Sequence, residues 1–291
     1  KERAFMGFAE VITNLSTVLG FIKFCKEDIS EFNPDKIIFI DNSGFNLRIA
    51  KWAKAANFHT IYYISPQVWA SRPGRVKDIK RDIDEMYVIL PFEEDFYKNK
   101  HNYNVDFVGH PLLDAIEDKK EFSKQKFISE NKLSSKPIIA LLPGSRNQEI
   151  SKLLPVMLNV ISGFEDYQII IAGAPSKNIN YYERIIQANK ASDNSIKEIC
   201  NQTYNILRVS SAAIVTSGTA TLETALFRVP QVVCYKGSAI SYQIAKRIIT
   251  LKFISLVNLI MDKEVVTELI QSDFNKKRLK KELEIILDKK E

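Results

Sequence analysis

Short apolar runs alternate along this chain with stretches of helical periodicity. Short runs bounded by Pro, Gly, Asn or Asp are typical of strands buried in a parallel sheet, and apolar positions three and four residues apart are typical of the helices that cover it. In its first part the pattern predicts strands at 36–41, 59–64, 85–90 and 105–109, separated by helices at 45–56, 76–84 and 92–100. This βαβαβαβ order predicts a parallel sheet with right-handed crossovers.

A second series of the same kind begins after Pro137. The charged, lysine-rich stretch 112–136 separates it from the first series. Because 291 residues fit two domains, we predict an α/β fold with domains at 1–110 and 111–291. The second series predicts strands at 138–142, 167–172, 212–216 and 231–235, a weaker strand near 196, and helices at 150–161, 181–189, 204–211, 240–249, 265–270 and 277–287.

The segment 5–24 carries a strongly apolar stripe at helical spacing. A core-facing helix is the default interpretation of such a stripe. A helix that dips into a membrane interface is the alternative, because Lys23 and Lys26 stand beside Phe21 and Phe24. No apolar run of the chain reaches the roughly 18 residues that a membrane span needs.

The charge balance narrows the classes of ligand only slightly. Lys and Arg total 41 and Asp and Glu total 35, which gives a net charge of +6. This mild excess suits phosphorylated ligands or an anionic membrane surface, and by itself it gives no argument for nucleic acid. Cys25, Cys200 and Cys234 are far apart and odd in number, so we expect neither a disulfide framework nor a zinc site, and a reducing cytoplasm fits best.

Residues 138–150 predict an anion-binding turn between a strand and a helix. The strand ends at a Pro-Gly pair that includes Gly144, and Ser145 can cap the helix, with Gln148 placed to complete a capping box. Free backbone N–H groups and the helix dipole meet at such a turn, and Arg146 adds a cation suited to phosphate. An ordinary strand-to-helix turn with a surface arginine is the alternative.

A second turn of this kind, Ser217-Gly218-Thr219, precedes a helix that carries Glu223. Its small side chains and two hydroxyls let phosphate oxygens approach a helix N-terminus. A carboxylate on the first turns of that helix can accept hydrogen bonds from a ribose diol. A helix cap with a glutamate favoured by the dipole is the alternative, although two such turns in one domain are harder to dismiss than one.

Asp41 stands at the carboxyl end of the first predicted strand. Ligands gather at the carboxyl ends of strands in parallel α/β sheets, so a carboxylate here can act as a general base. It can also simply cap the following helix, and the residues alone favour that second role.

Several motifs, in order over nearly the whole chain, carry a resemblance to a known family. The most specific are Ser-Pro-Gln-Val-Trp-Ala at 65–70 and Leu-Pro-Gly-Ser-Arg at 142–146. With them the chain resembles the lipid-A-disaccharide synthases, GT-B glycosyltransferases of Gram-negative bacteria. The resemblance implies two Rossmann-like domains that face a cleft, the first of them without its N-terminal βα units, because the Gly-rich opening turn of the family has no match here. The other matching stretches are 5–11, 39–46, 90–93, 107–111, 217–223 and 255–259.

The resemblance implies an inverting transfer from UDP-2,3-diacylglucosamine to 2,3-diacylglucosamine 1-phosphate (lipid X). The products would be lipid A disaccharide 1-phosphate and UDP. Inversion needs one base and no covalent intermediate, and we expect no cofactor and no metal, because Arg146 and helix dipoles can meet the leaving charge. Matching by position implies that Asp41 is the base. The leaving diphosphate would be met by Gly144, Ser145 and Arg146 and held by Ser217, Gly218 and Thr219. Glu223 would bind the ribose, and Asn258 would face the cleft.

Both implied substrates carry long acyl chains, so the resemblance implies a cytoplasmic enzyme that is peripheral at the inner membrane. Basic Arg72, Arg75, Lys77, Lys80 and Arg81 would add attraction for anionic headgroups. A homo-oligomer is left open.

Two other interpretations stay open from the sequence. Another UDP-sugar GT-B enzyme, such as an epimerase on soluble sugars, would share the 217–223 turn but gives no reason for the loop at 65–75. A non-catalytic nucleotide-binding α/β module fits the missing opening units, but it gives no reason for Asp41, Arg146 and Glu223.

Overall fold

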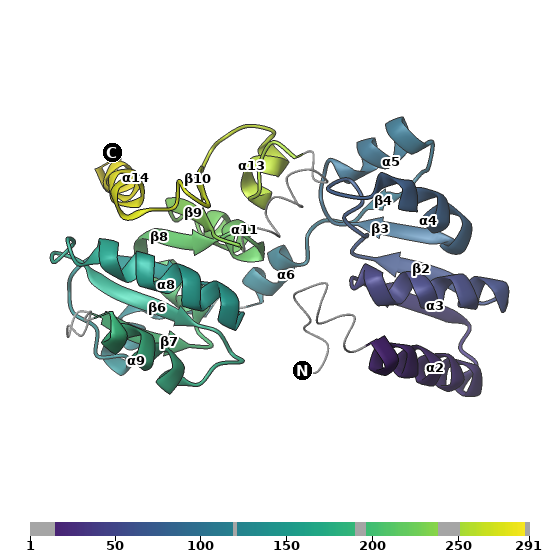
Figure 1. Ribbon diagram of the computed structural model, residues 1–291, viewed down its shortest axis with the longest axis horizontal. Helices are drawn as coiled ribbons and strands as arrows, with labels where there is room; N and C mark the ends of the chain where they lie inside the picture. The colour runs from purple at the N-terminus through teal and green to yellow at the C-terminus, as the bar shows by residue number, and fades with distance from the viewer. Residues whose placement is uncertain (1–14, 119–120, 190–195, 238–250, 289–291) are drawn as a thin grey trace. The chain divides into compact units, whose positions relative to one another are not determined.

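The computed structural model describes residues 15–118, 121–189, 196–237 and 251–288. The chain divides into two compact units, Lys1–Pro111 and Leu112–Glu291, beside the boundary expected at 110/111. Each unit carries a parallel sheet of its own (Figure 1). The predicted α/β class with two parallel sheets is confirmed.

The N-terminal unit contains a four-stranded sheet in the order β1-β2-β3-β4, and its neighbouring strands are parallel. Strands that follow one another in the chain are neighbours in the sheet, and their parallel pairing is the one that the βα alternation predicted. Its elements are α2 (Leu15–Phe32), β1 (Lys36–Ile40), α3 (Ser43–Ala55), β2 (His59–Tyr63), the 3₁₀ turn η1 (Pro73–Arg75), α4 (Val76–Asp82), β3 (Glu85–Val88), α5 (Glu93–His101) and β4 (Asp106–Phe107).

Strand β1 is buried on one face only. Ile37 and Phe39 pack in one core with residues of α2, α3 and α4, whereas Ile38 and Ile40 are 60% and 57% exposed. The prediction of a buried strand at 36–41 is therefore wrong for half of its side chains. The described helices that contact β1 cover one of its faces, and an apolar run by itself does not distinguish one covered face from two.

The C-terminal unit contains a six-stranded sheet in the order β10-β9-β8-β5-β6-β7, again with parallel neighbours. From β5 the chain winds outward through β6 and β7, and from β8 it winds the opposite way through β9 and β10. The direction of winding therefore reverses between β5 and β8. The elements are α6 (Leu112–Glu117), α7 (Lys124–Glu130), β5 (Ile138–Leu142), α8 (Asn147–Ile161), β6 (Gln168–Gly173), α9 (Ile179–Ala188), β7 (Ile196–Cys200), α10 (Thr203–Val209), β8 (Ser210–Thr216), α11 (Thr219–Leu226), β9 (Gln231–Tyr235), α13 (Leu256–Met261), β10 (Thr267–Ile270) and α14 (Lys276–Asp288).

Helices cover both faces of this second sheet (Figure 1). On one face, Leu141 of β5 shares a core with Leu154 of α8 and Leu283 of α14. On the other, Ala140 shares a second core with Ile206 of α10. All five residues of β5 are buried, as its unbroken apolar run predicted.

The predicted helix at 265–270 is wrong. The structure has strand β10 there, parallel to β9, with Thr267 opposite Val232 and Ile270 opposite Tyr235. The β-branched residues of this segment suit a pleated edge strand, and a six-residue helix would have few bonds to stabilise it. The predicted helix at 240–249 lies outside the described residues.

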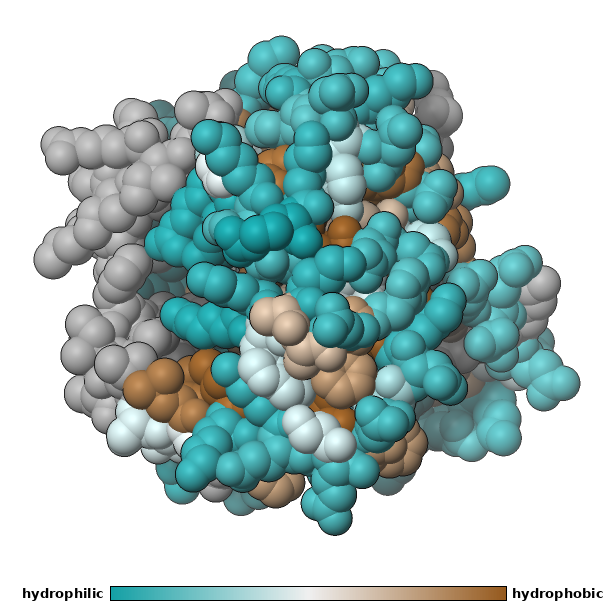
Figure 2. All heavy atoms as spheres, turned by 90° about the vertical axis from the view of Figure 1, so that its right-hand side faces the viewer, coloured by the Kyte–Doolittle hydropathy of each residue, from teal (hydrophilic) through white to brown (hydrophobic). Residues whose placement is uncertain are grey.

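Helix α2 is the described part of the apolar N-terminal stripe. Its Ile22 is buried, while Leu19 and Phe24 are 55% and 65% exposed. In the described ranges no helix combines the length and the apolar run that a membrane crossing requires. Figure 2 shows one face of the molecule, on which hydrophilic side chains predominate and apolar ones form small, separate areas. The alternative of membrane contact was placed on the whole stripe at 5–24, of which residues 5–14 lie outside the described residues.

Candidate active site

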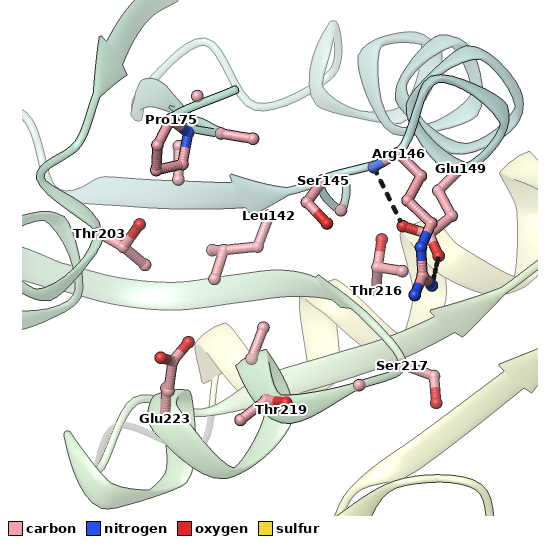
Figure 3. Close-up of a pocket in the computed structure, with 16 residues that line it drawn as sticks. Leu142, Ser145, Arg146, Glu149, Pro175, Thr203, Thr216, Ser217, Thr219 and Glu223 are labelled. Atoms are coloured by element: carbon pink, nitrogen blue, oxygen red, sulfur yellow. Dashed lines mark hydrogen bonds and ion pairs between the residues drawn. The ribbon is translucent and has the colours of Figure 1, made fainter. Parts of the chain in front are cut away.

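A pocket of about 430 Å³ opens in the C-terminal unit where the winding direction reverses (Figure 3). The turn after β5 lines it with Gly144, Ser145 and Arg146, and the turn after β8 lines it with residues 217–219. Ligands of open α/β sheets gather at such a reversal, outside the carboxyl ends of the strands. The two turns that the sequence singled out, more than 70 residues apart in the chain, thus form one pocket.

Gly144 shapes the first turn. Its φ is 100°, a backbone conformation that favours glycine, and a Cβ atom here would displace the Glu149 carboxylate, whose Oε2 would lie 2.7 Å away. The N-cap of α8 is Arg146, and its backbone N–H donates to Glu149 Oε2 at 3.4 Å. The capping box predicted for Ser145 and Gln148 is therefore wrong by one residue. Arg146, with extended backbone, is thus the last residue before the helix, and Ser145 belongs to the turn.

Arg146 places a cation at the rim of the pocket. Its Nη1 lies 3.0 Å from Glu149 Oε1, and Figure 3 shows the two side chains next to each other. The arginine is exposed, and an ion pair of this kind contributes only about 0–1 kcal/mol to stability. The guanidinium can therefore turn toward an anion at small cost.

The second turn offers backbone donors to the same space. Gly218 is the N-cap of α11, and its φ of 153° and ψ of −163° lie in a region that is essentially restricted to glycine. Its helix has no side-chain cap, so the first N–H groups of α11 are available to an anion. Ser217 Oγ donates to Ile254 O at 3.1 Å, while Thr219 is exposed at the pocket.

Glu223 points from α11 into the pocket, opposite Thr203 (Figure 3). Tyr204 Oη donates to Glu223 Oε1 at 3.3 Å, and the Tyr204 ring packs against Phe227 with 5.3 Å between centroids. Burial and the Glu223 carboxylate raise the pKa of the Tyr204 hydroxyl. The sequence pattern gave no sign of Tyr204, because nothing in the spacing of α10 and α11 shows that the two helices bring these side chains together.

Asp41 follows β1 in the N-terminal unit, with a φ of 46°. Its carbonyl oxygen accepts hydrogen bonds from Tyr62 Oη at 2.5 Å and from Asn46 Nδ2 at 2.8 Å, which hold this left-handed residue in place. The side chain is exposed and has no hydrogen-bond partner among the described residues. The helix-capping alternative is wrong, since the N-cap of α3 is Asn42 and no side chain caps it.

Comparison with known proteins adds the family. A family model described as Lipid-A-disaccharide synthetase matches residues 1–291. The chain belongs to the lipid-A-disaccharide synthase family. The Lipid-A-disaccharide synthase of Syntrophus aciditrophicus (strain SB) is 38% identical over 292 residues, which cover 98% of this chain and 75% of that protein. The predicted family, a family of glycosyltransferases, is confirmed.

Solved structures show the same fold at low identity. A putative UDP-N-acetylglucosamine 2-epimerase from Listeria monocytogenes has a TM-score of 0.61 at 15% identity, covering 100% of this chain and 74% of its own. The UDP-GlcNAc 2-epimerase from Methanocaldococcus jannaschii in complex with UDP-GlcNAc and UDP has a TM-score of 0.60 at 14% identity, covering 94% and 74%. These likenesses agree with the expected GT-B fold, and the family match decides between the lipid-A-disaccharide synthases and the other interpretations.

The motif at 65–70, which marks the lipid-A-disaccharide synthase family in the sequence, is held by a buried carboxylate. Glu93 accepts hydrogen bonds from Ser65 Oγ at 2.5 Å and from Trp69 Nε1 at 3.1 Å. It also accepts from the backbone N–H groups of Ile89 and Leu90. Burial raises the pKa of Glu93, against the effect of these hydrogen bonds. Two family motifs, 65–70 and 90–93, thus form one structure that fixes the loop after β2.

Asn258, expected to face the cleft, is completely buried in α13. Its Nδ2 donates to Val266 O and Glu268 Oε1, and its Oδ1 accepts from the N–H groups of Val265 and Val266, so the amide has no donor or acceptor left for a ligand. The side chain of Asn258 therefore does not face the cleft as expected, because its hydrogen bonds join α13 to the start of β10. Glu268 also accepts from the N–H of Ile254, whose carbonyl holds Ser217, so this network supports the second turn.

Proposed function

We propose that this chain transfers a diacylglucosamine unit from UDP-2,3-diacylglucosamine to lipid X. The single observation that carries the proposal is the pocket at the winding reversal, in a chain of the lipid-A-disaccharide synthase family. Its two helix N-termini and Arg146 match a diphosphate, and Glu223 matches a ribose diol. In this proposal Gly144, Ser145, Ser217, Gly218 and Thr219 surround the diphosphate.

The reaction is an inversion at the anomeric carbon of the donor sugar. Asp41 takes the proton from the acceptor hydroxyl as its oxygen forms the new bond, and the bond from the anomeric carbon to the UDP oxygen breaks on the opposite face. UDP leaves with the bonding electrons. Arg146 and the N–H groups of the two turns stabilise the negative charge that develops on its diphosphate. The exposed carboxylate of Asp41 suits a base that must reach its substrate.

We further propose that the enzyme works from the cytoplasm, peripheral at the inner membrane, because both substrates carry acyl chains. The extra free energy of membrane contact would come from apolar side chains of the N-terminal stripe. A homo-oligomer is compatible with this arrangement.

The test of the proposed function is a transfer assay in detergent micelles with UDP-2,3-diacylglucosamine and lipid X. We expect the chain to form the disaccharide, and Asp41→Asn to lower kcat by about 10²- to 10⁴-fold, the usual contribution of a general base. UDP binding should be unchanged in this variant, because Asp41 lies outside the pocket residues.

Asp35→Asn is the matched control, since Asp35 is an exposed aspartate just before β1, at the opposite end of the same strand. It should retain full activity. Equal activity of Asp41→Asn and wild type would remove Asp41 as the base while leaving the reaction in place. A wild-type chain that binds no UDP would contradict the proposed use of both turns.

A further inference from the structure

Three arginines gather near the fixed loop that follows β2. Arg72 and Arg75 bracket the turn η1, where Arg75 N donates to Arg72 O at 3.1 Å. Arg48 comes from α3, and its guanidinium donates to Gly44 O. Burial first, and then the charges of Arg72 and Arg48, lower the pKa of Arg75. The charges of Arg72 and Arg48 thus both act on Arg75, and we call these three side chains the arginine cluster.

Within the described residues, no carboxylate forms an ion pair with the arginine cluster. Asp78 is the carboxylate that acts on Arg75, and it lies 3.1 Å from Arg81. Among the described residues none of the three arginines has a carboxylate oxygen within 4.0 Å. A concentration of guanidinium groups with unused donors favours a compact anion with more than one negative charge, because planar donor pairs match phosphate oxygens.

Two neighbouring basic residues, Lys80 and Arg81, have polar partners of their own. Lys80 Nζ donates to the carbonyl oxygens of His101 and Asn102, and Arg81 Nε lies 2.7 Å from Asp82 Oδ1. The basic stretch after β2 is thus no uniform surface for headgroups. Arg72 and Arg75 stand on a loop whose first part, at Ser65 and Trp69, is fixed by Glu93, and such a fixed loop suits one defined ligand.

The arginine cluster lies at the same edge of the sheet as Asp41. Strands β1 and β2 are parallel neighbours, and Asp41 N donates to Tyr63 O at 3.1 Å where both strands end. Arg48 stands on the helix that follows Asp41, and Arg72 and Arg75 stand on the loop that follows β2. A ligand bound by the cluster would therefore approach the carboxylate assigned as base.

We infer that Arg48, Arg72 and Arg75 bind the phosphate monoester of the acceptor sugar. This inference rests on the proposed function, because it assumes that the acceptor is a sugar 1-phosphate. The site would orient the acceptor so that its hydroxyl meets Asp41, and it would select phosphorylated over unphosphorylated acceptors. An anionic lipid headgroup offers the same phosphate chemistry, and the experiment distinguishes the two sources.

The experiment measures binding by calorimetry in uncharged detergent micelles, without UDP-sugar. The two ligands are 2,3-diacylglucosamine 1-phosphate and its analogue without the phosphate. Wild type should bind the phosphorylated ligand about tenfold or more tightly, as charge-assisted bidentate contacts allow. The double variant Arg72→Gln/Arg75→Gln should bind both ligands equally and bind UDP like wild type. Lys77→Gln, a change of an exposed basic residue at the start of the next helix, should keep the wild-type preference.

Each result has a defined meaning. Equal binding of the two ligands by wild type, or an unchanged preference in the double variant, would overturn the inference. Loss of flotation with phosphatidylglycerol vesicles, in a double variant that keeps its preference in micelles, would assign the arginine cluster to headgroups and also overturn it. If the preference depends on the two arginines but wild type forms no disaccharide, the phosphate site stands and the proposed transfer falls. Matching thermal midpoints would show that the variants are folded.

Discussion

At the scale of single residues, Glu198 on β7 is a carboxyl whose protonation should make the stability of the fold depend on pH. Its Oε1 accepts from Cys200 Sγ at 3.1 Å, and its Oε2 is buried without a hydrogen-bond partner. Burial raises the pKa of Glu198 to about 7, with Glu183 adding to the rise and Cys200 opposing it. The carboxyl lies behind Gly173 in the pocket wall, where a Cβ atom would collide with Cys200 Sγ.

This raised pKa predicts how stability changes with pH. Between about 4.3, the usual value for glutamate, and about 7, the folded state holds a proton that the unfolded state has released, so stability falls as pH rises. Glu198→Gln should remove this fall. The free energy of unfolding of the variant, relative to that of wild type, should therefore be about 1 kcal/mol higher at pH 8 than at pH 5, a value discounted for partial exposure. Urea unfolding at both pH values measures it.

The control for Glu198 is Glu165→Gln, a change of an exposed glutamate in the same unit. Its free energy of unfolding should follow that of wild type at both pH values. A constant difference between Glu198→Gln and wild type from pH 5 to 8 would show that this carboxyl does not titrate in the range.

At the scale of elements, the loop after β2 depends on α5 for its shape. Glu93 is the first residue of α5, and it brings Ser65, Trp69 and the end of β3 together around one buried carboxylate. Trp69 also packs edge-on against Phe92, with 4.9 Å between ring centroids. The loop that carries Arg72 and Arg75 thus begins from a fixed base.

Removal of the Glu93 carboxylate should therefore loosen this loop. Glu93→Ala leaves buried donors of Ser65, Trp69 and Leu90 without their acceptor, and we expect a loss of about 2–4 kcal/mol in the stability of the N-terminal unit. Thermal unfolding gives the loss, and hydrogen exchange at 65–70 locates it.

Glu94→Ala changes the next residue, which is exposed, and should stay within about 0.5 kcal/mol of wild type. If Glu93→Ala and Glu94→Ala had the same stability, the carboxylate would not be the anchor of the loop.

At the scale of the whole molecule, the proposed chemistry is divided between the two units. The described residues that line the pocket belong to the C-terminal unit, whereas Asp41 and the arginine cluster belong to the N-terminal unit. This division predicts that the two substrates are recognised by different units.

Hydrogen exchange with UDP alone tests this division. UDP should slow exchange at 142–149 and 216–223 by about tenfold or more at 100 times its Kd, because a ligand that binds only the closed form stabilises it by mass action. Exchange at 65–76 should not change. Uridine, which lacks the diphosphate, is the control ligand, and equal protection of the two turns by uridine would contradict their assignment to phosphate.

The sequence by itself determined the parts of this protein that depend on near neighbours. The apolar run of β5, the helical spacing of α8 and the small residues of the two turns predicted the C-terminal sheet and both walls of the pocket. Gly144 and Gly218 were recognisable because a tight turn next to a helix N-terminus requires glycine. The strand end at Asp41 was recognisable because an apolar run stops there and turn-forming residues follow.

Tertiary structure alone decided the features that depend on distant partners. Residues 265–270 became a strand because β9 offered an edge, and β1 buried one face because the helices of the described part of the chain pack against that side. The burial of Asn258, the contact of Tyr204 with Glu223 and the anchoring role of Glu93 each need elements that meet only in the fold. Periodicity records which side of an element is apolar, but it does not record which polar group lies opposite, and that pairing decides how a side chain is used.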